Sequence, residues 1–156
     1  MTEYKHLRRL ESVWINQPIF FITTCAYKRR PLLACPEIFS IIQDEFQTAP
    51  QRHGWHVGRF VVMPDHLHFF CACEDEETSS SLSRFVGAIK EWSSKRISRK
   101  LGIPAPIWQP EFFDHLFRSG ESYADKWLYV RENPVRAGLV KTAEDWAYAG
   151  EIEILL

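Results

Sequence analysis

Two histidines separated by one leucine, His66 and His68, are the residues whose types and spacing most directly suggest chemistry. They open an apolar segment, residues 66–73, that predicts a β-strand, so their side chains should emerge on the same face. Two imidazoles held in this way can share one metal ion. An isolated pair of this kind is more often two surface histidines on a half-exposed strand, so the motif alone leaves both interpretations open.

Cysteines on the same predicted strand raise the alternative of a zinc site with two histidine and two cysteine ligands. Strand alternation places Cys71 and Cys73 on the face opposite the histidines, which argues against that site. The remaining two, Cys25 and Cys35, complete no paired spacing typical of zinc binding or of a disulfide framework. We therefore expect four reduced thiols in the core.

Tyr129 is a second candidate, because the phenol of a tyrosine can attack a DNA phosphodiester and keep the bond energy in a phosphotyrosine linkage. A free phenol has a pKa of about 10 and attacks poorly at neutral pH, so a nearby divalent ion would help by neutralising developing charge. The two histidines and the amide oxygen of Asn133 would provide an open site for such an ion. An exposed tyrosine without chemistry is the plain alternative.

The helix expected to carry Tyr129 begins at Ser119 or Ser122. It should end at Asn133, because the residue before a proline disfavours the helical region. Tyr129 and Asn133 are four residues apart and would then share a face. At about 100° per residue, Tyr129 lies roughly 170° from the centre of the apolar stripe, which predicts that it is not a core residue. The stripe consists of Tyr123, Ala124, Trp127 and Leu128.

The elements that must position these side chains follow a recognisable order. Strands are expected at residues 19–24, 55–62, 66–73 and 112–118, and helices at residues 36–46 and from the serines at 79–81 until Gly102, before the tyrosine helix. This order predicts an α+β, ferredoxin-like fold, in which helices pack on one face of an antiparallel sheet and a C-terminal helix carries the tyrosine. The 156 residues fit a single domain.

Charge is nearly balanced, with a formal net charge of −1, so composition alone predicts no nucleic-acid partner. Basic residues nevertheless gather in several places, and two of these groups are candidates for DNA phosphate contact or simply solvated surface. One is Arg29 and Arg30; the other is a ridge on the long predicted helix formed by Arg84, Lys95 and Arg99. No apolar run approaches the roughly 20 residues that span a bilayer, so we expect a cytoplasmic protein without a membrane partner.

Three segments together resemble one known family, the HUH-type single-tyrosine transposases related to IS200 insertion sequences. They are VVMPDHLHFF around the histidines, IWQPEFFDHLFR at residues 107–118, and YVRENPVRAGLV from Tyr129. The second segment and Asn133 look most like the branch of REP-associated tyrosine transposases. The resemblance covers about residues 20–139, and three ordered motifs are far more specific than one histidine pair.

The resemblance implies that His66 and His68 bind Mg²⁺ or Mn²⁺, that Tyr129 is the nucleophile, and that Asn133 is the third ligand. Insertion-sequence transposases typically have glutamine in place of this asparagine. Asp65 stands where asparagine is usual, which adds negative charge near the metal without removing a ligand. Ligand softness alone would rank zinc or nickel above magnesium, so the choice of metal comes from the family. His115 and Arg118 lie within the resemblance but receive no role.

The substrate class implied by the resemblance is single-stranded DNA folded into a hairpin with a short flank. The enzyme would cut and rejoin this DNA through a 5′-phosphotyrosine intermediate. The main alternative is a domesticated module that binds single-stranded or hairpin DNA without cutting, and a third is a metal-dependent hydrolase of small phosphoesters. Both a monomer and a homodimer that exchanges its tyrosine helix fit the family, and the REP-associated branch favours the monomer.

Overall fold

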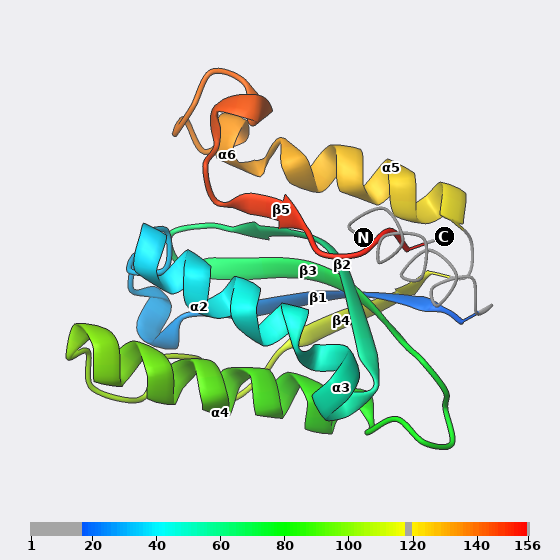
Figure 1. Ribbon diagram of the computed structural model, residues 1–156. Coiled ribbons are helices and arrows are strands. Elements are labelled where there is room, and N and C mark those ends of the chain that lie inside the picture. The colour runs from blue at the N-terminus through cyan, green and yellow to red at the C-terminus, as the bar shows by residue number, and fades with distance from the viewer. Residues whose placement is uncertain (1–16, 118–119, 156) are drawn as a thin grey trace, which may run out of the picture.

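The computed structural model describes residues 17–117 and 120–155 of the chain (Figure 1). Its elements follow in the order β1 (Ile19–Cys25), η1 (Tyr27–Arg29), α2 (Pro36–Gln47), α3 (Ala49–His53), β2 (Trp55–Val62), β3 (His66–Cys73), α4 (Leu82–Leu101), β4 (Phe113–Phe117), α5 (Gly120–Arg131), α6 (Asn133–Arg136), η2 (Ala143–Asp145) and β5 (Ala149–Glu151). Among the helices of these residues, none is both long enough and apolar enough to cross a membrane.

The strands form one antiparallel sheet in the order β4-β1-β3-β2-β5. The first four strands have the arrangement of a split βαβ sheet, in which α2 and α4 make the two crossovers. The predicted α+β, ferredoxin-like fold is therefore confirmed. The short strand β5, which pairs with the outer side of β2, was not predicted from the sequence.

Helices α2 and α4 lie together on one side of the sheet, which we call the α4 face (Figure 1). Alternation along the strands directs Phe60 and Phe69 to this face, where they contact Phe46 of α2 at ring-centroid distances of 5.2 and 4.8 Å. Helix α4 begins after Ser81, whose side chain accepts a hydrogen bond from the backbone N–H of Arg84, and ends at Gly102 in the left-handed conformation.

Replacing Phe46 by alanine should lower the free energy of unfolding by about 3–5 kcal/mol, because the substitution leaves a cavity among fully buried rings. Leu139→Ala, at a side chain that is 45% exposed, should change it by no more than about 0.5 kcal/mol. Chemical denaturation of the two variants measures the difference. Equal losses for both would mean that the ring cluster of the α4 face does not form the core.

Helix α5 covers the opposite side of the sheet, the α5 face (Figure 1). Its residues Tyr123 and Val130 are buried there against strand residues, and the ring of Tyr123 lies 4.6 Å from that of Phe70. Gly58 in β2 permits this approach, since a Cβ at this position would lie 2.7 Å from the Tyr123 hydroxyl. The backbone N–H of Arg59 donates a hydrogen bond of 3.2 Å to the same hydroxyl. These contacts set the height of α5 above the sheet.

The predicted tyrosine helix was wrong in two respects. Two members of its apolar stripe, Ala124 and Leu128, are exposed, Leu128 with 57% of its surface accessible, and Val130 takes a buried position instead. Helix α5 also ends at Arg131, and a separate short helix begins at Asn133, because a proline is tolerated in the first turn of a helix and Pro134 occupies that position. The predicted cap at Ser119 lies outside the described residues.

Candidate active site

His66 and His68 lie side by side on the α5 face, with ring centroids 4.7 Å apart. The Nδ1 atom of each ring has a polar partner. For His66 it is the Asp65 carboxylate, at 2.7 Å, and for His68 it is the Thr23 hydroxyl on the neighbouring strand, at 2.8 Å. Such partners fix the orientation of an imidazole and direct its Nε2 atom toward a bound ion.

The prediction that the cysteines face away from the histidines is confirmed. Cys71 and Cys73 belong to the core of the α4 face, while His66 and His68 alternate to the other side. All four cysteines are free thiols. A zinc site that combines these histidines and cysteines is therefore wrong for this fold. In residues 17–117 and 120–155, histidines, cysteines and carboxylates form no cluster of three or more that could hold a metal.

Asp65 connects the histidine pair to a basic residue. Its carboxylate pairs with the Nε atom of Arg29 at 2.9 Å as well as with His66. Burial raises the pKa of Asp65, but the hydrogen bonds from His66 and Arg29 outweigh this effect and hold its pKa below the ordinary value. The carboxylate at the position where the family usually has asparagine is thus ionised and fixed between a histidine and an arginine.

His68 is held in its neutral form. Burial, together with the positive charges of His66, Lys126, Arg136 and Arg29, lowers its pKa to about 3. A metal binds the neutral imidazole, so His68 needs no deprotonation at neutral pH before it can act as a ligand.

Tyr129 lies on the exposed side of α5, as predicted, with 60% of its surface accessible. Two cations contact its ring. The guanidinium carbon of Arg136 is 4.0 Å from the ring centroid and the Nζ atom of Lys126 is 5.1 Å from it. A phosphate that approached the phenol would therefore meet two positive charges.

A chain of ring contacts links the tyrosine to the histidines. Lys126 also lies over the ring of Phe21, at 5.1 Å, and Phe21 stacks on His68 with the ring centroids 5.1 Å apart. The site is thus assembled from β1, β3 and α5 on one face of the sheet.

Asn133, the implied third ligand, does not share a helix with Tyr129, contrary to the prediction. It begins α6, and its Oδ1 atom accepts a hydrogen bond from Arg136. The structure thus brings Asn133 to Tyr129 through Arg136, which contacts both residues.

The candidate DNA contacts fall in two groups. Arg29 and Arg30 follow β1; Arg29 joins the site through Asp65, whereas Arg30 donates to the backbone oxygen of Pro106. Helix α4, which carries the other group, packs on the opposite side of the sheet, so Arg84, Lys95 and Arg99 are not brought to the site. Lys95 pairs there with Glu91 at 3.0 Å. DNA contact by all five residues stays a prediction.

Sequence reasoning missed Thr23, Lys126 and Arg136. Lys126 precedes Tyr129 by three residues, so helical spacing could have placed it beside the phenol. The position of Thr23 depends on a strand register that pairs it with His68, and the position of Arg136 depends on the break between α5 and α6. Nothing in the local sequence around Thr23 or Arg136 indicates that either residue lies at the site.

A second tyrosine on α5, Tyr123, is unsuited to attack because it is buried. Burial raises the pKa of its phenol from 10.0 to about 12, and the hydrogen bond from Arg59 offsets only part of this rise. The folded state therefore keeps the phenol neutral while the unfolded chain ionises, so stability present below pH 10 should fall as the pH rises to about 12. Denaturation of the wild type and Tyr123→Phe across this range should show the loss in the wild type; parallel curves would contradict it.

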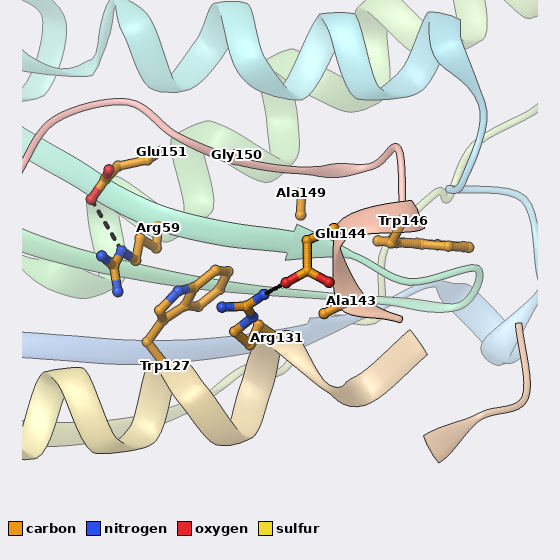
Figure 2. A pocket seen from close by; sticks show the side chains of 9 residues that line it. All are labelled: Arg59, Trp127, Arg131, Ala143, Glu144, Trp146, Ala149, Gly150 and Glu151. Carbon is orange, nitrogen blue, oxygen red and sulfur yellow. Dashed lines mark hydrogen bonds and ion pairs between the residues drawn. The ribbon is translucent and has the colours of Figure 1, made fainter. Parts of the chain in front are cut away.

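A pocket of about 380 Å³ lies between α5, η2 and β5 (Figure 2). Its two arginines are already paired, Arg59 with Glu151 at 3.1 Å and Arg131 with Glu144. The side chains of Trp127 and Trp146 also line it. Because each cation has an internal carboxylate, this pocket offers less net charge to a DNA phosphate than the surface around Tyr129.

Comparison with known proteins identifies the family of this sequence. The model of the family described as "Transposase IS200 like" matches residues 16–132, which include both histidines and Tyr129 but stop before Asn133. The chain belongs to this family.

Within the family, the chain is 25% identical over 150 residues to the REP-associated tyrosine transposase of Escherichia coli (strain K12), covering 96% of this chain and 82% of that protein. A solved structure of a REP-associated tyrosine transposase bound to a REP hairpin is similar in fold, with a TM-score of 0.64 at 24% identity over 86% of this chain and 76% of that one. A bacterial tRNA(His) guanylyltransferase-like protein in complex with GTP reaches a TM-score of 0.52 at 10% identity over 85% of this chain and 71% of that one, so the fold alone does not define the chemistry.

Proposed function

We propose that this chain cleaves and rejoins single-stranded DNA through a covalent 5′-phosphotyrosine at Tyr129. The observation that carries the proposal is an exposed phenol between two cations, on the same sheet face as a pair of oriented, adjacent histidines. Membership of a transposase family supports an activity on DNA.

In the proposed reaction, the Tyr129 oxygen forms a bond to the scissile phosphorus while the bond from phosphorus to the 3′ oxygen breaks. The phenol proton passes to solvent, and the departing oxygen takes up a proton to become a free 3′ hydroxyl. Lys126 and Arg136 hold the non-bridging phosphate oxygens against the phenol. Attack by a 3′ hydroxyl on the phosphotyrosine reverses the step and restores the free tyrosine, so no ATP is needed.

The residues present fit a divalent metal. The Nδ1 atoms of His66 and His68 are engaged by Asp65 and Thr23, an arrangement typical of histidines that bind a metal through Nε2. With Asn133 as a third donor, the site would take Mg²⁺ or Mn²⁺, by analogy with the family. When bound, the ion supplies charge neutralisation at the reacting phosphate.

The substrate we propose is single-stranded DNA that forms a hairpin with an unpaired flank, because the structurally similar REP-associated transposase is bound to a REP hairpin. We also propose that one chain completes the site, since Lys126 contacts both the Tyr129 ring and Phe21, which stacks on His68. A monomer is then sufficient for cleavage, and a homodimer that exchanges the tyrosine is not required.

A denaturing gel tests the proposal. The purified protein is incubated with a 3′-labelled hairpin DNA carrying unpaired flanks, in Mn²⁺ or in EDTA. We expect a labelled band at the mass of the protein in Mn²⁺ alone, because the 5′ phosphate of the labelled fragment becomes attached to the chain. Tight hairpin binding in a parallel gel shift without any adduct would contradict cleavage and favour the non-cutting module.

A further inference from the structure

A pocket of about 340 Å³ opens beside the histidine pair, between the edge strand β4 and helix α5. Its volume is in the range of small-molecule sites, about 300–1,000 Å³. Aromatic rings of Phe21, Phe113 and Phe117 line it together with His115, and Lys126 contributes the positive charge. Four of these residues thus come from β4 or β1, and the fifth from α5.

Strand register places this pocket on the α5 face, directly beside the histidine pair. Thr23 of β1 pairs with His68 on one side and with Phe113 on the other, so the three residues form a row across the sheet. Residues paired in this way point to the same face. Phe113 is therefore one strand farther out than the threonine that orients His68.

The pocket has the composition of a surface that stacks a planar ring. Phe113 is 70% exposed at the edge of the sheet, and the rings of His115 and Phe117 lie 4.7 Å apart. Aromatic rings that gather at the surface beside polar groups, rather than a single exposed ring, are typical of a binding site. Lys126, which also contacts the Tyr129 ring, lies between this pocket and the phenol.

We propose that this pocket binds an unpaired nucleobase of single-stranded DNA next to the scissile phosphate. The base stacks on Phe113 and His115, and Lys126 holds the adjoining phosphate at the boundary between the pocket and Tyr129. Base stacking on aromatic side chains combined with a cation for the backbone is the general mode of single-strand recognition. The inference rests on the proposed function, and it assigns a role to His115, which the family resemblance left without one.

Charge complementarity favours this pocket over the one between α5 and β5. Within residues 17–117 and 120–155, Lys126 lies over the rings of Phe21 and Tyr129 and pairs with no carboxylate, whereas the arginines of the other pocket pair with glutamates. Asp114 also lines the β4 pocket, but register pairs it with Ile22 of the α4 core, so its strand position faces the other side of the sheet.

Equilibrium binding in EDTA tests the pocket without cleavage. The probes are a short fluorescent single-stranded oligonucleotide of random sequence and an abasic backbone of the same length, measured by fluorescence anisotropy. We expect wild-type protein to prefer the oligonucleotide with bases, and Phe113→Ala to weaken its binding by about 5- to 100-fold while leaving the abasic probe unaffected. Phe113→Trp should retain the preference. Leu139→Ala, at another exposed apolar side chain, is the control and should leave both affinities unchanged.

Three results would overturn the proposed role of the pocket. They are an undiminished preference in Phe113→Ala, a wild type that binds both probes equally, and no binding at all. The thermal unfolding temperature of each variant, which should match the wild type because Phe113 is exposed, confirms that the fold is intact. The two proposals fail separately. Base-dependent binding without a covalent adduct would contradict only the proposed cleavage. An adduct whose DNA binding does not depend on Phe113 would contradict only the proposed base-binding pocket.

Discussion

Tyr129→Phe should abolish the covalent protein–DNA adduct, lowering its rate of formation by at least about 10⁴-fold, because removal of a nucleophile eliminates the covalent step. The phenylalanine keeps the ring that Lys126 and Arg136 contact and removes only the hydroxyl. DNA affinity in EDTA should therefore stay within about twofold of the wild type, since no charge is lost. Quantification of the adduct on denaturing gels and of binding by anisotropy provides both numbers.

Tyr123→Phe is the matched control on the same helix. Its phenol is buried and accepts a hydrogen bond from Arg59, so its loss should cost about 1 kcal/mol of stability and leave adduct formation intact. An adduct of undiminished yield in Tyr129→Phe, or its disappearance in a folded Tyr123→Phe variant, would show that Tyr129 is not the nucleophile.

Replacing either His66 or His68 by alanine should lower metal-dependent cleavage by at least about 100-fold, because each removes a ligand whose bound ion would contribute several kcal/mol of charge stabilisation. Mn²⁺ affinity, measured by calorimetry in the absence of DNA, should fall in parallel. This second readout separates a lost ligand from a general loss of activity.

Thr23→Val and Asp65→Asn provide graded controls for the histidines. Thr23→Val removes the partner of the His68 Nδ1 atom while keeping the side chain's size, so we expect a loss of about 10- to 100-fold in metal affinity, smaller than for the ligands themselves. Asp65→Asn keeps an oxygen beside the His66 Nδ1 atom and introduces the residue usual in the family, so its loss should be smaller again. If Mn²⁺ affinity were unchanged in both histidine variants, the metal would not be held by this pair, whatever happened to cleavage.

The hairpin of β2 and β3, whose second strand carries the histidine pair, could be predicted from the sequence with the bounds that the structure shows. Residues 55–62 and 66–73 are largely apolar runs separated by a turn with Pro64, and the alternation of side chains along a strand then fixes which face each one takes. The helix after the serine cluster could be predicted equally well, because Ser81 and Gly102 are strong signals for the start and end of a helix. Signals in the local sequence therefore determine where these strands and this helix begin and end.

The rest of the site depends on contacts between distant segments. The hydrogen bond between Thr23 and His68 spans 45 residues and requires the register of β1 with β3. The end of the tyrosine helix was misplaced because a proline can either stop one helix or occupy the first turn of the next. Tertiary packing of Pro134, which is buried, decides between these outcomes.

The separation of α4 and α5 onto opposite faces has a consequence for the length of DNA that the protein can engage. A short oligonucleotide seated at Tyr129 cannot also reach the basic ridge of α4, because the sheet stands between them. A strand that contacts both must pass around an edge of the sheet. If the ridge does bind DNA, affinity will rise in two steps with oligonucleotide length, and the second step will depend more steeply on salt than the first.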